Sequence, residues 1–479
     1  MLITENHCPV RFQAINHGQT IAIQDDQQQI SYQQLDIQLT HLAEQLSKQV
    51  TDSEPSTPIR LVCIANNGIP LLLLQLVCLR LGWLFCPLNP NFTESEIQQR
   101  LNILNSPYCW VEDNSRHHLL NSLNIDLSFC KKNIKPLSPL KINPLQPTNI
   151  IFTSGSSGFP KAIVHHYGNH YFSALGSQSS ISLQISDRNL LSLPLYHISG
   201  YATVMRTIIA GATLDLSNKD LSYPLLSSRK ITHLSLVSTQ LIRLLKDPHF
   251  SAQGCTLKHI LLGGSAFSVS LLTALAARGF TYHLSYGCTE MASQVATSTN
   301  NNQLIVLPYR EVKIHNEQIY FRGATRFIGY FRDNKLIKID PKRWVSSGDC
   351  GRLKGDQLII SGRKDRQFIS GGENIQPEEI EALCLQVPYV EKAYIVPIKD
   401  AQYGQRMAVF IAFSDANLIH FEQYCEQLKQ YLKQHLTRFK QPDHYLAWPS
   451  SECSHRLKEP KAEFIKSTHN TGFNYLNHV

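Results

Sequence analysis

Short apolar runs alternate with amphipathic stretches along most of the chain, and this alternation predicts strands separated by helices. Apolar residues at the three- and four-residue spacing of a helix occur in 94–104 and 268–278. Strands that alternate with helices are typical of a doubly wound, largely parallel sheet, so the large N-terminal part is predicted to be α/β. The runs expected to form its strands are 61–65, 149–152, 189–193, 233–237 and 259–262.

The most hydrophobic segment, 69–88, contains Gln75 and Arg80, whose polar groups would be costly in a lipid bilayer. A buried helix over 70–81 followed by a strand over 84–88 explains it better. No stable membrane insertion is therefore expected.

The pattern changes after Gly323, where shorter β-like runs and two helices predict a small α+β domain. We place the boundary in 362–365, which gives a large domain over 1–364 and a small one over 365–479. The elements expected in this part are strands at 335–339, 357–361, 390–396 and 408–413, and helices at 377–385 and 421–435. Near the N-terminus, the glutamine-rich stretch 24–38 is expected to form a solvated hairpin and the start of a helix.

Length and composition favour an ordinary globular protein of two to three domains, because the chain has 479 residues, 43% hydrophobic and 17% charged. The net charge of +8 suits anionic ligands such as nucleotides. The basic residues are scattered and form no run like a nucleic-acid-binding tail, so nucleic acid is not an expected partner.

Twelve cysteines occur at irregular positions, and none forms the C-x-x-C pair typical of zinc or redox sites. They are interpreted as buried, reduced cysteines. The N-terminus lacks a basic segment followed by an apolar one, so a secretory signal is not expected. We expect a cytoplasmic location.

A loop of small residues follows the predicted strand 149–152. Its backbone amides and hydroxyls could approach a polyphosphate, and its lysine could supply charge. The order of a Walker A loop is absent, and a flexible Gly/Ser loop is the alternative interpretation. The loop reads Thr153, Ser154, Gly155, Ser156, Ser157, Gly158, Phe159, Pro160 and Lys161.

A second candidate runs from Tyr286 through Gly287 and Cys288 to Thr289 and Glu290. A carboxylate beside a hydroxyl suits a magnesium ion that bridges phosphate oxygens, and the tyrosine offers a face for stacking adenine. The alternative is a turn capped by Thr289 with Glu290 in solvent.

A third candidate joins Asp349, which follows Ser347 and Gly348, to Arg363 fourteen residues later. A carboxylate can accept both ribose hydroxyls, and an arginine can reach the sugar or the α-phosphate. The alternative is a β-turn and a surface ion pair.

These three blocks, in this order and at these separations, resemble the adenylate-forming superfamily of acyl-CoA synthetases, peptide synthetase adenylation domains and luciferases. The resemblance covers nearly the whole chain. It implies that 154–161 holds the β- and γ-phosphates of ATP, that 286–290 holds adenine, phosphate and Mg²⁺, and that Asp349 with Arg363 holds ribose. It also implies an ATP-dependent ligase of two domains.

Further stretches are similar to the 2-succinylbenzoate CoA ligases of menaquinone biosynthesis, among them PLYHISG at 194–200, SLVSTQ at 235–240, LLGG at 261–264 and SGGENIQPEE at 370–379. This similarity implies that Arg206 and Ser235 bind the acid. Arg206 lies in the apolar stretch 201–209, where an unpaired arginine would be expensive to bury. Its alternative is an arginine that extends out of a helix to solvent.

Family analogy also implies that His197 acts as a gate near the acyl and thiol tunnels. The alternative is a histidine buried in the core, which is the commoner role of such a residue. Gly263 and Gly264 follow a predicted strand, where missing side chains would let a flat ligand pack against backbone. Both glycines are expected to face the nucleotide, and Gly263 also the acid.

The implied mechanism has two steps, in which the acid attacks the α-phosphate of ATP and coenzyme A then displaces AMP. The family uses a lysine near the C-terminus for the first step, and Lys458 matches it, with Lys461 as a lesser candidate because the usual preceding glycine is missing. Rotation about Lys364 or Asp365 would exchange this lysine for a loop that contains Gly371 and Gly372, next to CoA.

The sequence leaves three functions open: a 2-succinylbenzoate CoA ligase, a CoA ligase for another aryl or short acyl acid, and an inactive nucleotide-binding relative. The intact Lys161, Glu290, Asp349 and Arg363 argue against the third. A homo-oligomer is compatible with the sequence.

Overall fold

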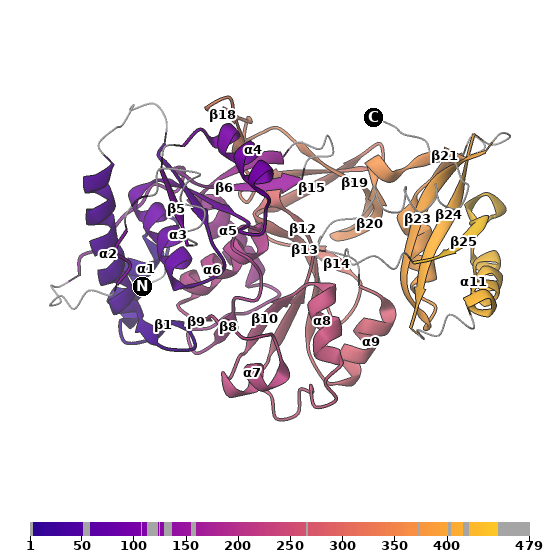
Figure 1. The fold of residues 1–479 in the computed structure, drawn as a ribbon, viewed down its shortest axis with the longest axis horizontal. Coiled ribbons are helices and arrows are strands. Elements are labelled where there is room, and N and C mark those ends of the chain that lie inside the picture. The colour runs from indigo at the N-terminus through magenta and orange to yellow at the C-terminus, as the bar shows by residue number, and fades with distance from the viewer. Residues whose placement is uncertain are drawn as a thin grey trace. The chain divides into compact units, whose positions relative to one another are not determined.

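The computed structural model describes residues 3–50, 58–106, 108–112, 123, 125–128, 137–154, 160–264, 267–370, 373–400, 404–414 and 421–448. The chain divides into two compact units (Figure 1). The large unit contains Met1–Gly263, Arg278–Val312 and Phe321–Val345, and the small unit contains Gly264–Ala277, Lys313–Tyr320 and Ser346–Val479. The predicted domain boundary at 364/365 stays a prediction.

One sheet of the large unit has a parallel centre, in which β10 pairs with both β8 and β11, and β11 pairs with β12. Antiparallel pairs flank this centre, because β12 turns back into β13 and β1 into β2. The strands, in spatial order, are β14 (Leu304–Val306), β13 (Ser293–Thr299), β12 (Tyr282–Cys288), β11 (His259–Leu262), β10 (His233–Leu236), β8 (Arg188–Leu190), β9 (Thr213–Asp215), β1 (Ile21–Gln24) and β2 (Gln29–Ser31).

A second sheet of the large unit is parallel across β6, β4, β3 and β5 and antiparallel across β6, β7, β17 and β18. Its strands are β18 (Lys335–Lys338), β17 (Gly329–Arg332), β7 (Pro160–His166), β6 (Pro147–Ser154), β4 (Leu84–Leu88), β3 (Arg60–Ile64) and β5 (Tyr108–Val111). The expected strands 84–88 and 259–262 are confirmed to the residue. The strand expected over 189–193 is shorter, because Ser192 N–H turns back to Leu190 O and β8 ends there.

Helices cover these sheets. In α3, ten of thirteen residues are buried, as expected for a helix that is apolar all round. Helix α4 begins with a capping box, in which Thr93 and Glu96 satisfy each other's backbone N–H groups. The helices of the large unit are α1 (Pro9–His17), α2 (Tyr32–Gln49), α3 (Ile69–Leu81), α4 (Glu94–Leu104), α5 (Tyr167–Ser177), α6 (Ile198–Ala210), α7 (Tyr223–Ser228), α8 (Ser238–Leu245) and the 3₁₀ turn η2 (Thr289–Met291).

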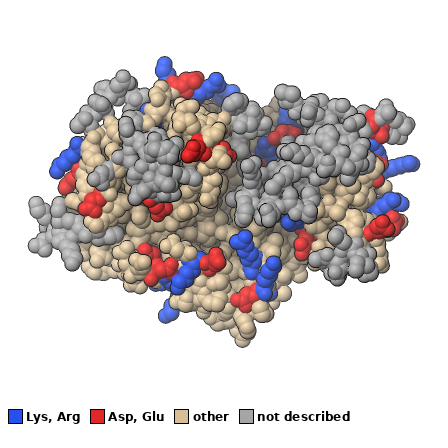
Figure 2. Space-filling view, viewed as in Figure 1, with Lys and Arg blue, Asp and Glu red and all other residues tan. Residues whose placement is uncertain are grey.

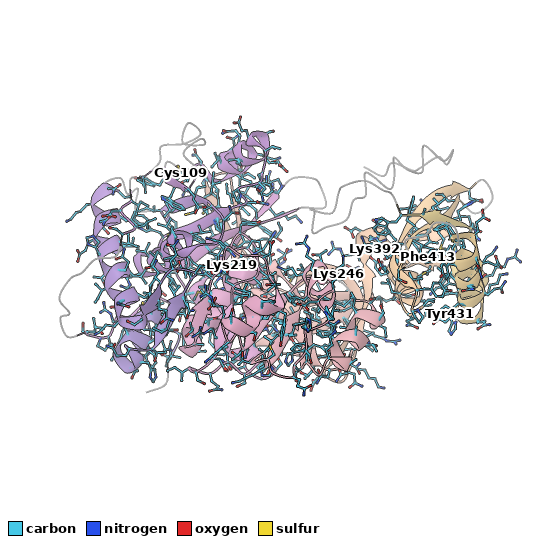
Figure 3. All side chains as sticks on the ribbon, turned by 60° about the horizontal axis from the view of Figure 1, so that its bottom comes forward. Cys109, Lys219, Lys246, Lys392, Phe413 and Tyr431 are labelled. Carbon is cyan, nitrogen blue, oxygen red and sulfur yellow. The ribbon has the colours of Figure 1, made fainter. Side chains whose placement is uncertain are left out.

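The small unit contains a three-stranded sheet, in which β24 pairs antiparallel with β23 and parallel with β25. Leu428 and Leu432 of α11 pack on its core, and Phe413 and Tyr431 lie partly buried against that core (Figure 3). The elements are α9 (Val269–Ala277), β19 (Val345–Lys354), β20 (Gln357–Arg363), η3 (Lys364–Arg366), β21 (Phe368–Ser370), β22 (Glu373–Ile375), α10 (Pro377–Cys384), β23 (Val390–Asp400), β24 (Gly404–Phe413), α11 (Phe421–His435), η5 (Arg438–Lys440) and β25 (His444–Ala447). Strands β15 (Arg310–His315) and β16 (Gln318–Gly323) lie where the chain passes between the units.

Three predictions about composition can be compared with the described residues. Every cysteine among them is a free thiol. On the face seen in Figure 2, described Lys and Arg residues are interspersed with Asp and Glu. None of the described helices combines the length and the apolar character that crossing a membrane requires.

Candidate functional site

The predicted phosphate loop connects two antiparallel strands. Thr153 at the end of β6 pairs with Lys161 of β7, and Lys161 is exposed. The residues between these ends, Gly155, Ser156, Ser157 and Gly158, lie outside the described residues, and so does the side chain of Ser154. The hairpin therefore fixes where the loop leaves and re-enters the sheet.

The second predicted block begins in β12 and ends in η2. A Cβ atom on Gly287 of β12 would lie 1.9 Å from the carbonyl oxygen of Ser293 of β13, so only glycine fits at this position. The backbone carbonyl of Thr289 accepts a hydrogen bond from His165 Nε2 at 2.7 Å, and that of Glu290 accepts one from Phe327 N–H at 2.7 Å. These bonds hold the turn that carries the Glu290 carboxylate.

The carboxyl ends of three parallel strands gather the large unit's other predicted residues at one sheet edge. Ser235 lies one residue before the end of β10, Gly263 directly follows β11, and Tyr286 lies near the end of β12. Ligands of open α/β sheets bind outside the carboxyl ends of the strands. Gly264, which belongs to the small unit, has a φ of +84°, a conformation that favours glycine.

Arg206 lies on α6 and does not reach solvent, because only 7% of it is exposed. It forms no ion pair with any described carboxylate, and burial lowers its pKa to about 10. Its guanidinium makes three long contacts, at 3.3 Å to Ala202 O, 3.3 Å to Gln294 Oε1 and 3.5 Å to Thr203 Oγ1. The structure thus excludes the alternative in which this arginine extends to solvent.

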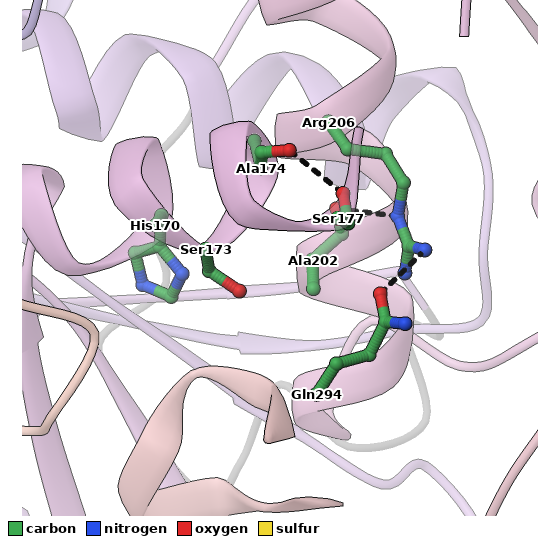
Figure 4. A pocket seen from close by; sticks show the side chains of 7 residues that line it. All are labelled: His170, Ser173, Ala174, Ser177, Ala202, Arg206 and Gln294. Carbon is green, nitrogen blue, oxygen red and sulfur yellow. Dashed lines mark hydrogen bonds between the residues drawn. The ribbon is translucent and has the colours of Figure 1, made fainter. Parts of the chain in front are cut away.

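Arg206 faces two small cavities. One is lined by side chains of α5, α6 and β13, including His170, Ser173 and Gln294 (Figure 4). The other also contains Ser235, so the structure brings together the two residues predicted to bind the acid.

A second buried arginine, Arg310, lies close to the first and was not predicted from the sequence. Burial and the positive charge of Arg206 lower its pKa to about 9. Its hydrogen bonds go to neutral oxygens, among them Ser173 Oγ at 3.1 Å and Gln294 O at 2.9 Å. Two buried cations without an acidic partner among the described residues create a positive potential that favours an anion.

His197 is the residue that precedes α6, and its ring lies 4.9 Å from that of Tyr196. Its backbone N–H donates to Pro194 O at 3.1 Å. A Cβ atom on Gly200 would lie 2.1 Å from that same carbonyl oxygen, so glycine is required where the helix begins. The start of α6 is therefore tightly fixed around His197, while its predicted role as a gate remains a prediction.

In the small unit, Asp349 and Arg363 are cross-strand neighbours on β19 and β20. Arg363 donates to Asp349 Oδ1 at 3.0 Å and to Asp365 Oδ1 at 3.2 Å. Burial opposes the charge of Arg363, but the hydrogen bonds and charges of Asp365 and Asp349 outweigh it and raise its pKa. The ion pair anticipated as the structural alternative is thus present, and Lys364 and Asp365 lie in the adjoining η3 turn.

Several predicted residues cannot be located. Lys458, Lys461, Gly371 and Gly372 lie outside the described residues. Among the described parts, no group of three or more His, Cys, Asp or Glu side chains is arranged to hold a metal ion. The role of Glu290 as a Mg²⁺ ligand stays a prediction; its carboxylate oxygens are of the kind that Mg²⁺ prefers.

Sequence reasoning missed Arg310, Gln294 and a chain of polar side chains behind the site: Asn149, His165 and His170. The sequence around them is mixed: Arg310 precedes Glu311, Gln294 follows Ser293, and His165 precedes His166, so none stands out as Arg206 does in its apolar stretch. Their contacts also gave no local signal, since they join residues up to 138 positions apart.

The comparisons with known proteins agree on one family. A family model described as AMP-binding enzyme matches residues 10–331, and one described as AMP-binding enzyme C-terminal domain matches 379–452. The 2-succinylbenzoate–CoA ligase of Haemophilus influenzae is 34% identical over 394 residues, 81% of this chain and 82% of the relative. The enzyme of the same name from Escherichia coli is 32% identical over 437 residues, 90% and 92% of the two chains.

A solved structure is similar over the full length. Wild-type Escherichia coli MenE with a bound m-phenylether-linked analogue of OSB-AMS aligns with a TM-score of 0.80 and 30% identity, covering 98% of this chain and 100% of that one. The predicted architecture, a large α/β part with a small α+β C-terminal part, is confirmed.

Proposed function

Since the chain belongs to the AMP-binding enzyme family and is an acid–thiol ligase, we propose that it converts 2-succinylbenzoate, ATP and coenzyme A into 2-succinylbenzoyl-CoA, AMP and pyrophosphate. The relatives from Haemophilus influenzae and Escherichia coli, which carry this activity in their names, match 81% and 90% of the chain. We propose that the enzyme acts in the cytoplasm, in menaquinone biosynthesis.

The observation that carries the choice of acid is the unpaired, buried Arg206. An isolated buried cation is costly, and a carboxylate that forms charged hydrogen bonds with it would offset that cost. A dicarboxylic acid can present one carboxylate to Arg206 while the other reacts. Arg310 strengthens the positive potential behind it.

In the first step, an oxygen of the reacting carboxylate attacks the α-phosphorus of ATP, and the bond to the bridging oxygen breaks to release pyrophosphate. Lys161 and the loop 153–158 would neutralise the leaving phosphates. Tyr286 and Gly287 would contact adenine, with Gly263 and Gly264 against the flat ligand, while Thr289 would contact phosphate. Glu290 would hold Mg²⁺, which supplies charge neutralisation at the phosphates when bound.

In the second step, the CoA thiolate sulfur attacks the acyl carbon, and the carbon–oxygen bond to AMP breaks. Asp349 and Arg363 would hold the ribose during both steps. We propose Lys458 for adenylation and the loop with Gly371 and Gly372 for CoA, exchanged by a movement of 365–479 against 1–364 about Lys364 or Asp365. His197 would gate the acyl and thiol paths.

Pyrophosphate release against a panel of acids tests the assignment. We expect release with 2-succinylbenzoate and much less with two analogues, each lacking one carboxylate. Release confined to acids with a single carboxylate would assign the enzyme to another aryl or short acyl acid. No release with any acid would favour an inactive relative. Formation of the CoA thioester, followed by mass, then checks the second step.

A further inference from the structure

A chain of hydrogen bonds runs through the interior of the large unit from the Arg206 cavity to the Thr289 turn. His170 Nε2 lies 2.7 Å from Asn149 Oδ1, and Asn149 Nδ2 lies 3.4 Å from His165 Nδ1. His165 Nε2 lies 2.7 Å from Thr289 O. The three side chains come from α5, β6 and β7, and each is at most 1% exposed.

The chemistry of these groups allows one arrangement of hydrogens. A carbonyl oxygen only accepts, so His165 Nε2 carries the hydrogen that is donated to Thr289. Burial lowers the pKa of His165 to about 4 and that of His170 well below its usual value, so both rings are neutral near pH 7. His165 Nδ1 is then an acceptor, which fixes the amide of Asn149 with its NH₂ toward His165 and its oxygen toward His170.

The far end of the chain is His170, which lies beside the cavity of Arg206. His170 donates through Nε2, so its Nδ1 is an acceptor, and this atom has no hydrogen-bond partner among the described residues. His170 lines the same cavity as Arg206 (Figure 4). A carboxylate has no hydrogen to donate, so a bound acid would meet Nδ1 through a bridging water.

We propose that His170, Asn149 and His165 form a positioning relay, which fixes the Thr289–Glu290 turn for the nucleotide and ties it to the acid cavity beside Arg206. The identity of the acid in this relay rests on the proposed function. The effect of the relay on ATP binding does not. None of the three side chains touches the reacting atoms in this scheme. They act by holding the carbonyl of Thr289, and with it the Glu290 carboxylate.

A pair of variants at His165 separates the relay from a purely structural role. His165→Leu removes the donor to Thr289, whereas the amide of His165→Gln can still donate. We expect His165→Leu to lower kcat for pyrophosphate release about tenfold or more and to raise the Kd for ATP similarly. We expect His165→Gln to restore most of both. Tyr32→Phe is the matched control, because it removes a buried hydrogen bond of 2.7 Å to a backbone carbonyl elsewhere, at Ala212.

Asn149→Asp supplies a signature that a structural role would not give. The new carboxylate faces His165 Nδ1, which must now donate, and only the imidazolium can donate there and to Thr289 at once. The carboxylate raises the pKa of His165, so the ratio of variant to wild-type kcat should rise about tenfold from pH 8 to pH 6. Within the described parts of the chain, the other titratable groups beside His165 are His166 and His170, and burial lowers the pKa of both.

Failure of the relay and failure of the proposed function give different results. Wild-type protein that releases no pyrophosphate with 2-succinylbenzoate contradicts the function, and the Kd for ATP, measured by calorimetry without acid, still tests the relay. The relay is overturned when folded His165→Leu binds ATP within twofold of wild type. It is also overturned when Asn149→Asp shows the wild-type pH profile. Thermal unfolding alongside Tyr32→Phe establishes that each variant is folded.

Discussion

Arg206→Leu removes a buried charge that no described carboxylate balances while it keeps most of the apolar bulk of the side chain. The pKa of Arg206 falls by about 2.5, from 12.5 to about 10. A tenfold change in an acidity constant is worth about 1.4 kcal/mol, so burial destabilises the charged form by about 3 kcal/mol. The ligand-free variant should therefore be as stable as wild type or more stable.

The same change should strongly impair the reaction with the dicarboxylic acid. Removing one partner of a buried, hydrogen-bonded charge pair costs about 2–5 kcal/mol, which is roughly a 30-fold to several thousand-fold loss in kcat/KM for 2-succinylbenzoate. With the reactive analogue that lacks the other carboxylate, kcat/KM should change little. The assay is continuous pyrophosphate release with both acids, together with thermal unfolding of the ligand-free proteins.

Arg80→Leu is the matched control. Arg80 is also a buried helical arginine, but it donates to Asp36 at 2.6 Å, and Asp36 is fully buried. Its loss removes one ion pair of the buried Asp36 carboxylate and should lower the free energy of unfolding by about 3–5 kcal/mol. The preference between the two acids should not change. The reasoning is refuted if Arg206→Leu is destabilised like Arg80→Leu, or if it loses activity equally with both acids.

The remaining predictions concern acid stability, the nucleotide turn and the adenylation lysine. Burial lowers the pKa of His233 and His283 to about 4, below the unfolded value of 6.5, so the free energy of unfolding decreases as pH falls from 6.5 toward 4. Each histidine should contribute a loss of about 2 kcal/mol at pH 5. Urea unfolding measures this loss, which should be smaller in the His→Gln variants. Gly287→Ala should lower stability by about 1–3 kcal/mol and weaken ATP binding, because its Cβ would overlap a backbone oxygen, and equal stability would contradict this. Lys458→Ala should abolish adenylation while sparing thioester formation from preformed acyl-AMP, and normal adenylation would move the role to Lys461.

Local pattern was enough to predict several elements, some of them to the residue. Helix 94–104 carries its own capping box, and helix 421–435 has a clear apolar face, so both were predicted to the residue. Strand 189–193 was predicted too long, because its end depends on where Ser192 N–H turns, which no periodicity encodes.

The site was predicted less completely, for a related physical reason. Arg206 could be singled out because a charge inside an apolar helix is costly wherever its partners lie. Its contact Gln294 is 88 positions away, and His165 and Thr289 are 124 positions apart. Such pairs are created by the order of strands in the sheets, so the sequence signals only that a polar group is buried.

The buried charges of the large unit differ in whether they have an ion-pair partner. Some of these charges form close ion pairs: Asp36 binds Arg11 and Arg80, and Asp187 binds Lys258. Arg206 and Arg310 form no ion pair with a described carboxylate, and Arg206 lines a cavity together with His170, whose buried Nδ1 has no hydrogen-bond partner among the described residues. An uncompensated charge and an unsatisfied nitrogen at one place are not needed in a purely structural core, since apolar residues of similar volume would be at least as stable. A bound acid that supplies a carboxylate and carries a water with it would satisfy both, which is the physical reason for proposing that this cluster selects the substrate.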